Sequence, residues 1–311
     1  MLLSKNVLSG ENYTYREGFT SGLEFISDSI LAFAGIFERF DTLFPPWFQE
    51  HNGMIYFFDL EGDTISTKRF IGDGFLEFSR LYYDRVRKRI YAGGGTRDTL
   101  IEPGLAYTVC LDSAGNLLWD QRLGDGILTE LTGLYDVFDN GNIVAGGIVS
   151  QPPDQQNGKW YKMDGNGNAY FEKVVGTFGY DREIEIKVSK NQHSLIARQT
   201  IDTLISPGDY EKCTYIGKMD TNGVFLWRTF LNDVYYKYLY TTRTFSDGSI
   251  VAVGVRYVDD TFEPHGYMVK LDSNGTVLWE RDYTNNPDGN HYLYDFQKMP
   301  DGGYIASRTW G

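Results

Sequence analysis

The sequence repeats itself at intervals of 52–56 residues, and this repeat limits the possible folds more than any other feature. Each copy has an aspartate followed three residues later by a glycine, and in four copies an aromatic residue stands seven residues after the aspartate. The copies begin at Leu111 (LDSAGNLLWDQ), Met163 (MDGNGNAYFEK), Met219 (MDTNGVFLWRT), Leu271 (LDSNGTVLWER) and, more weakly, Phe58 (FDLEGDTISTK). Self-similarity at a fixed period is typical of an array of similar supersecondary units.

A second motif divides each unit into two hairpins. An Ile- or Leu-like residue, an apolar residue and an alanine recur behind a polar turn; the alanines are Ala32, Ala92, Ala145, Ala197, Ala252 and Ala306. In the first motif the aspartate is suited to cap a tight turn with its carboxylate, and the glycine supplies the positive φ that ends it. With 35 glycines, 23 tyrosines and no helical period of useful length, the chain favours short strands joined by tight turns.

These patterns predict an all-β fold, a β-propeller of four-stranded blades. We expect six blades with the last one incomplete; the alternative is seven or more blades in an untruncated parent. The prediction is one β-propeller domain over 1–311, or a fragment of one, with an N-terminal strand at 2–10. The repeat units fall near 25–72, 78–124, 130–176, 182–232, 236–284 and 292–311.

Two sets of repeated residues are predicted to be structural. Ala92, Ala145 and Ala252 lie where only a methyl group fits if adjacent sheets approach closely. The aromatic residues Trp119, Phe171, Trp227 and Trp279 are expected to cover the seam to the next blade and to stabilise it. Ser66 holds this position in the first copy, so its seam should be filled differently or be weaker, with nearby Phe70 as a substitute.

The aspartate, the turn ending in glycine and the tryptophan four residues later resemble the tryptophan-docking repeat of quinoprotein-like propellers. The segments YMVKLDSNGTVLWE from Tyr267 and DGGYIASRTWG from Asp301 are also similar to secreted repeat propellers common in Bacteroidota. This resemblance covers essentially the whole chain and implies the propeller fold. Quinone enzymes of this kind use an adjacent cysteine pair and a calcium site, whereas Cys110 and Cys213 are far apart, so we expect no cofactor.

The composition of the chain limits the classes of molecule that it is expected to bind. The chain has 42 Asp and Glu against 29 Lys and Arg, a formal charge of -13, which disfavours nucleic acid and anionic membranes as partners. No metal-ligand spacing, nucleophile elbow or phosphate loop is present, so no catalytic residue and no metal site are predicted. The protein is expected to be a monomer without membrane insertion. No secretory signal is visible, and the expected location, extracellular or on the cell surface, follows from the resemblance.

The loops between the second and third strands of the units hold the candidate binding residues. Arginines recur before a D-T-L or D-T-F segment, and Trp47 marks an aromatic loop tip. One interpretation is a ring of polar groups that meets a ligand; the other, which we favour, is that each arginine pairs with its loop aspartate and pins the loop. The candidate binding residues are Trp47, Arg97, Arg198, Arg256 and His265.

The function predicted from these features is a non-catalytic, secreted or cell-surface scaffold that binds a protein or a glycan through its long loops. The alternative is a hydrolase or lyase that acts on polysaccharide in the propeller mouth. A cluster of carboxyl groups from different blades with raised pKa values would favour the enzyme.

Overall fold

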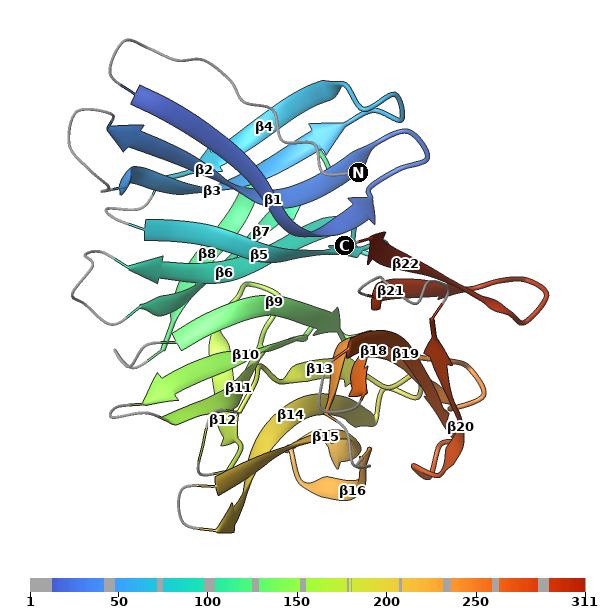
Figure 1. The fold of residues 1–311 in the computed structure, drawn as a ribbon. Helices are drawn as coiled ribbons and strands as arrows, with labels where there is room; N and C mark the ends of the chain where they lie inside the picture. Colours follow the sequence, from blue (N-terminus) through green and yellow to red (C-terminus); the bar gives the residue numbers. More distant parts are fainter. Residues whose placement is uncertain are drawn as a thin grey trace. The chain divides into compact units, whose positions relative to one another are not determined.

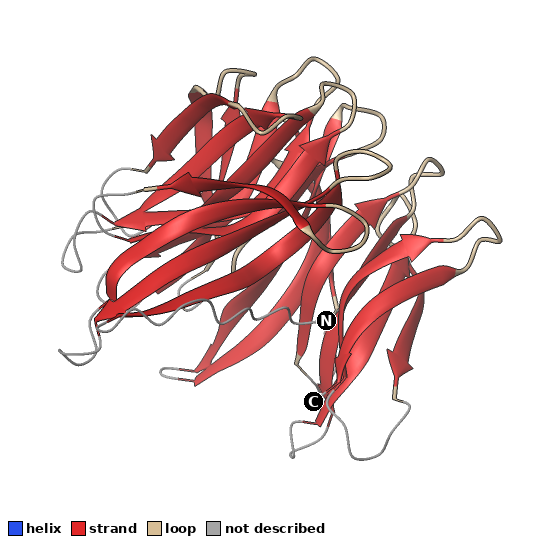
Figure 2. Cartoon of the chain, turned by 90° about the horizontal axis from the view of Figure 1, so that it is seen from above, coloured by secondary structure: helices blue, strands red, loops and turns tan. Residues whose placement is uncertain are grey.

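A computed structural model describes residues 13–41, 48–71, 75–97, 104–124, 129–151, 155–177, 179, 181–206, 209–231, 236–258, 263–284 and 291–310. Within these ranges the chain forms strands β1 to β22 and no helix, so the all-β prediction is confirmed for this part of the chain (Figure 2). No helix long and apolar enough to cross a membrane occurs in the described ranges.

The first eight strands form two antiparallel meanders, here called sheet 1 (β1–β4) and sheet 2 (β5–β8). One parallel bridge between His51 and Phe75 joins them into an eight-stranded sheet, and the two rings stack with centroids 3.8 Å apart. The strands are β1 (Tyr13–Phe25), β2 (Leu31–Asp41), β3 (Phe48–Phe58), β4 (Thr64–Phe70), β5 (Phe75–Asp84), β6 (Arg89–Arg97), β7 (Leu105–Asp112) and β8 (Leu117–Leu123).

The next twelve strands form three separate four-stranded antiparallel meanders, here called sheets 3, 4 and 5. A two-stranded terminal hairpin follows them (Figure 1). Sheet 3 contains β9 (Thr129–Val137), β10 (Ile143–Gln151), β11 (Gln155–Met163) and β12 (Ala169–Val175). Sheet 4 contains β13 (Glu185–Val188), β14 (Ser194–Ser206), β15 (Asp209–Asp220) and β16 (Phe225–Phe230). Sheet 5 contains β17 (Lys237–Thr244), β18 (Ile250–Val258), β19 (Glu263–Leu271) and β20 (Val277–Tyr283), and the hairpin contains β21 (His291–Lys298) and β22 (Tyr304–Trp310).

The strands are grouped in two compact units. Unit 1 comprises Met1–Pro152 and Lys159–Glu172, and unit 2 comprises Pro153–Gly158 and Lys173–Gly311. The repeated four-stranded antiparallel sheets are consistent with a propeller. The first strand begins at Tyr13, whereas the sequence analysis starts the first unit near residue 25. Register shifts on either side of Ser21 interrupt the period-2 pattern of β1, which hides it from sequence analysis. The expected strand at 2–10 lies outside the described residues.

The turn chemistry predicted from the repeat is confirmed. In sheet 2 the carboxylate of Asp112 accepts hydrogen bonds from the backbone N of Ala114 at 2.9 Å and of Asn116 at 2.8 Å. Gly115 closes this turn with a φ of +82°. The same aspartate-to-backbone bonds recur at Asp164, Asp220 and Asp272, and the turn glycines Gly62, Gly167, Gly223 and Gly275 also have positive φ.

Apolar cores lie between successive sheets within each unit. Ala92 belongs to the core between sheets 1 and 2, Ala145 to the core between sheets 2 and 3, and Ala252 to the core between sheets 4 and 5. Each of these alanines is 0% exposed. Because protein interiors are close-packed, a larger side chain on these second strands would displace the facing sheet.

The repeated aromatic residues are half-buried, and two of them lie against the next turn of the repeat. Trp119 of β8 packs on Tyr91 with ring centroids 6.0 Å apart and reaches the turn of sheet 3 at Gly167. Trp227 of β16 lies in the same way against Gly275 of sheet 5. Trp279 packs near Tyr304 of the terminal hairpin at 6.1 Å. Phe171 contacts Trp160 of its own sheet at 4.9 Å.

Candidate functional site

The feature of unit 2 best suited to bind a ligand is a group of half-exposed tyrosines, here called the tyrosine cluster. Its members are Tyr236, Tyr238, Tyr240, Tyr257, Tyr292 and Tyr294. They come from the first strand of sheet 5 and the residue before it, from the end of β18, and from β21 of the terminal hairpin. Segments far apart in the sequence therefore contribute to one aromatic surface.

Adjacent rings of the cluster are in contact. Tyr236 stacks on Tyr257 with centroids 5.4 Å apart and an interplanar angle of 16°. Tyr238 meets Tyr240 edge to face at 4.9 Å, and Tyr240 meets Tyr294 at 4.7 Å. Such offset and edge-to-face pairs are the favoured arrangements of aromatic side chains. The rings hold one another in place before any ligand arrives.

The local sequence explains why the tyrosines share a face. Alternation along β17 places Tyr238 and Tyr240 on one side and Lys237 and Leu239 on the other. Lys237 and Leu239 are buried, and Leu239 belongs to the core between sheets 4 and 5. Burial of that side leaves the tyrosine side half-exposed.

The cluster is partly accessible to solvent. Tyr294 is 40% exposed, and the other five tyrosines are half-buried. Burial raises the pKa of Tyr236 to about 12 and that of Tyr257 to about 12, and a hydrogen bond with Tyr292 contributes to the latter shift. At neutral pH the hydroxyl groups can therefore both donate and accept hydrogen bonds.

Charged groups border the cluster on the side of sheet 4. The hydroxyl of Tyr238 donates a hydrogen bond to Glu183, and the side chain of Arg182 is hydrogen-bonded to Tyr236. The ammonium group of Lys212 lies 5.7 Å from the centroid of Tyr236, within the range of a cation–π contact. The site thus combines flat apolar faces with a few polar groups, as ligand sites generally do.

A buried ion pair contacts the strand that bears Tyr238 and Tyr240. Arg198 of β14 is 2% exposed, and its Nε donates to Glu185 Oε2 at 2.7 Å. Its Nη2 donates to the backbone carbonyl of Tyr240 at 2.6 Å. One guanidinium therefore joins the first strand of sheet 4 to the tyrosine-bearing strand of sheet 5.

Asp181, which precedes β13, has a raised pKa because it is buried. Its carboxylate accepts hydrogen bonds from Thr177 Oγ1 at 3.0 Å and from the backbone N of Asp202 at 2.8 Å. The side chain is 0% exposed, so it does not present its proton to a ligand at the surface. These contacts hold the segment before sheet 4 against β14.

Of the predicted binding residues whose side chains are described, the structure brings two together. Arg256 and His265 are cross-strand partners in β18 and β19. Arg256 Nη1 lies 3.0 Å from Asp282 Oδ2, and His265 Nε2 lies 3.9 Å from Glu263 Oε2. Trp47 lies outside the described residues, as does the side chain of Arg97. Arg198 is buried beneath the tyrosine cluster, as described above.

The expected pairing of each arginine with its loop aspartate is wrong at Arg198. Its ion-pair partner is Glu185, the residue directly opposite it on β13. Asp202 lies near Lys212, with Oδ1 and Nζ 3.6 Å apart. Asp202 belongs to β14 itself, four residues beyond Arg198 and so about 13 Å further along the strand, whereas Glu185 lies directly opposite the arginine.

Sequence reasoning missed the tyrosine cluster, although the sequence contains a signal for it. Tyrosines alternate in the segment YYKYLY, which ends at Tyr240, and again in HYLY, which ends at Tyr294. Both segments occupy the first-strand position of consecutive repeat units. A period of two places their rings on one face of each strand, and the repeat places those strands side by side.

The described residues contain no group of three or more His, Cys, Asp or Glu side chains that could hold a metal ion.

No protein-family model matches the chain, and no curated protein matches it. Among solved structures, an endo-arabinase from Bacteroides thetaiotaomicron VPI-5482 is similar at 9% identity over 73% of this chain and 87% of that chain, with a TM-score of 0.43. A glucose dehydrogenase is similar at 8% identity over 93% and 95% of the two chains, with a TM-score of 0.48. A Synechocystis ACO mutant is similar at 10% identity over 90% and 70%, with a TM-score of 0.49.

Proposed function

We propose that this protein binds a glycan chain on the tyrosine cluster and that it acts as a non-catalytic scaffold. The observation that carries the proposal is the set of six mutually packed, half-exposed tyrosines in unit 2. Neutral hydroxyl groups and flat ring faces occur together there, and a sugar offers the matching surfaces. The apolar C–H face of a pyranose packs on an aromatic ring while its hydroxyl groups form hydrogen bonds.

The charged border favours a glycan that carries acidic groups. Arg182 is exposed beside Tyr236, and Lys212 is 38% exposed on the same ring. A carboxylate on a sugar can pair with these cations while the ring stacks on the tyrosines. The long loops predicted from the sequence, including that of Trp47, would extend the surface.

The finer architecture and the setting are also part of this proposal. The repeat supports a six-bladed propeller whose last blade is incomplete, within one domain. We place the protein outside the cytoplasm or on the cell surface, as a monomer that does not insert into membranes. A protein partner in place of a glycan is the other outcome of the binding test below.

The competing function is a hydrolase or lyase that acts on polysaccharide. A hydrolase of this kind uses two carboxyl groups held on either side of the scissile bond, and a lyase needs a base that removes a proton from the sugar. Among the described residues, Glu183 is a carboxylate at the cluster's border, and Asp181 nearby is fully buried. If the protein is such an enzyme, its catalytic activity should depend on Glu183, and Glu183→Gln should abolish that activity.

The test is a glycan array probed with the purified full chain, followed by incubation with each bound polysaccharide. The proposal expects retention on acidic glycans and no release of reducing ends or unsaturated products. Product formation that disappears in Glu183→Gln would establish the enzyme. Absence of glycan retention, with capture of a protein from the same biological source, would replace the glycan by a protein partner.

A further inference from the structure

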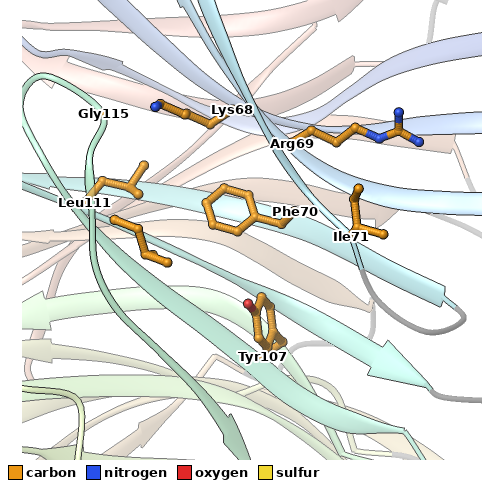
Figure 3. A pocket seen from close by; sticks show the side chains of 8 residues that line it. Lys68, Arg69, Phe70, Ile71, Tyr107, Leu111 and Gly115 are labelled. Atoms are coloured by element: carbon orange, nitrogen blue, oxygen red, sulfur yellow. The ribbon is translucent and has the colours of Figure 1, made fainter.

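Aromatic rings of the protein fill the seam between sheets 1 and 2, where Ser66 replaces the tryptophan of other seams. The edge of the Phe57 ring would lie 3.1 Å from a methyl group built on Gly115. Phe70, which lines the groove shown in Figure 3, packs edge to face on Phe78 at 5.1 Å. These two rings take the place of the indole, so the seam is filled differently from the others, as predicted.

The tyrosine cluster of unit 2, by contrast, has partly exposed rings and a cation beside them that is open to a ligand. Arg182 is exposed, and its side chain is hydrogen-bonded to Tyr236. No carboxylate of the described residues lies within ion-pair distance of its guanidinium. The other cation of the border, Lys212, already lies 3.6 Å from Asp202 Oδ1. An anionic group on a ligand would therefore meet Arg182 first.

Two consecutive residues of β14 fix the backbone of Arg182. Its N–H donates a hydrogen bond of 2.8 Å to the carbonyl of Thr200, and its carbonyl accepts one of 3.0 Å from Gln199 Nε2. The residue before it is anchored as well, since the N–H of Asp181 donates to the carbonyl of Gln156 at 2.8 Å. The segment that carries the cation is thus held on both sides.

Gln199 is a buried bridge to this segment. Its side chain is 0% exposed; Nε2 also donates to the carbonyl of Val175 at 3.1 Å, and Oε1 accepts a hydrogen bond of 2.9 Å from the hydroxyl of Tyr215. These partners determine the orientation of the amide, because its nitrogen faces two carbonyl groups and its oxygen a hydroxyl. A buried network in which every member is satisfied resists movement, since any shift would cost a hydrogen bond.

We propose that Arg182 binds the carboxylate of a uronic acid in the glycan and that Gln199 is the positioning residue of this cation. The inference rests on the glycan function proposed above and names the sugar that it would recognise. A guanidinium presents parallel N–H groups, and the two oxygens of a planar carboxylate fit this fork. Because its backbone is already fixed, the arginine loses less conformational freedom when the ligand binds.

The test is a calorimetric titration of the full chain with tetramers of galacturonic acid and of glucuronic acid, each compared with its methyl ester. The ester keeps the sugar rings and removes the charges. The ratio of the dissociation constants, ester over acid, therefore reports recognition of the carboxylate. Since exposed ion pairs are weak, we expect a ratio of about five for the better-bound tetramer and the parent chain.

Arg182→Gln should lower this ratio to about one, because the paired cation is lost. Lys190→Gln removes the same charge from an exposed residue of the turn between β13 and β14, outside the cluster, and should leave the ratio unchanged. Lys212→Gln should lower the ratio less than Arg182→Gln does, since Asp202 already faces that lysine. A ratio that Arg182→Gln leaves unchanged would overturn the proposal, as would equal losses in all three variants.

Gln199→Met keeps the length of the side chain but removes its hydrogen bonds, and it should lower the ratio to about two. The control is Ile196→Ala, which truncates a core residue of the same strand and should leave the ratio at the parent value. A purely structural role of Gln199 would weaken acid and ester alike, and an unchanged ratio would refute the positioning role. If Gln199→Met fails to fold, Gln199→Asn replaces it with the same expectation, because its shorter amide cannot reach both carbonyl groups.

Failure of this inference is distinguishable from failure of the proposed function. If acid and ester bind equally well and both lose affinity in Tyr294→Ala, the tyrosine cluster binds glycans, but Arg182 does not recognise the carboxylate. If neither the tetramers nor their esters show saturable binding, the inference is overturned, and the glycan array decides the proposed function.

Discussion

Trp119 and Gly165 are joined across the seam between sheets 2 and 3: the indole Nε1 donates a hydrogen bond of 3.1 Å to the glycine carbonyl. The same carbonyl accepts a second hydrogen bond, of 2.8 Å, from Arg89 Nη1. Two donors from sheet 2 therefore fix the turn of sheet 3, while the face of the indole covers Gly167. The repeat motif therefore forms a contact between one four-stranded sheet and the next within unit 1.

Truncation of this contact should destabilise the fold. For Trp119→Ala we expect a loss of about 2–3 kcal/mol in the free energy of unfolding, somewhat below the usual cost for a fully buried tryptophan because the ring is half-buried. Trp119→Phe keeps a ring but loses the hydrogen bond, at a cost of about 1 kcal/mol or more. Urea denaturation measures both, with the exposed neighbour Leu118→Ala as the control. Equal stability of all three variants would show that the motif does not stabilise the seam.

The ion pair of Arg198 and Glu185 should be costly to break from one side. Glu185→Leu leaves a buried guanidinium without its carboxylate, and we expect a loss of about 3–5 kcal/mol. The double variant Arg198→Met with Glu185→Leu should recover part of this loss, because no unpaired charge remains. A double-mutant cycle, measured by urea denaturation, gives the interaction free energy between Arg198 and Glu185. Additive effects of the two single changes would mean that the pair does not act as a unit.

Both cysteines should be unreactive in the folded protein. Cys110 is 0% exposed, and burial raises the pKa of its thiol to about 12; Cys213 is also buried. The thiolate is the reactive form, so a disulfide reagent at pH 8 should modify neither residue until the chain unfolds. Rapid labelling of one thiol per native chain would contradict the structure.

The turn aspartates should make the free energy of unfolding fall as the pH is lowered. The side chain of Asn116 lowers the pKa of Asp112, and that of Asn168 lowers the pKa of Asp164. A carboxylate with a lowered folded-state pKa stabilises the fold above its unfolded pKa of about 4 and loses this effect as the pH falls through the folded value. Thermal melts between about pH 6 and about pH 2 should therefore show a steeper decline for the parent than for the double variant Asp112→Asn with Asp164→Asn. Parallel declines would exclude the turns as the cause.

The sequence predicted those parts of the fold that depend on local chemistry. The turns are local, since an aspartate and a glycine three residues apart determine them, and the strands follow from the spacing between turns. The strand Tyr13–Phe25 was missed because its bulges break the alternation. The partner of Arg198 was also missed, because the identity of a cross-strand neighbour depends on register.

The candidate site was harder to predict than the fold. Tyr240 and Tyr294 are 54 residues apart, and their contact becomes visible only when both first strands are placed. The arginines were predicted to be binding residues because they repeat, yet Arg198 is buried and bonded to Glu185 and to the backbone of Tyr240. The tyrosines do not repeat in every unit, and a feature confined to neighbouring units is a better candidate for binding than one present in all.

The most direct test of the glycan proposal is the affinity of the array-selected acidic oligosaccharide for matched tyrosine variants. Tyr294→Ala removes the most exposed ring of the cluster, whereas Tyr170→Ala removes a tyrosine in sheet 3 that is 53% exposed and outside it. Since one aromatic contact contributes about 1.4 kcal/mol, the account predicts about a tenfold weaker dissociation constant for Tyr294→Ala and no change for Tyr170→Ala. Identical affinities of the two folded variants, measured by calorimetry, would contradict the proposal that the tyrosine cluster is the binding surface.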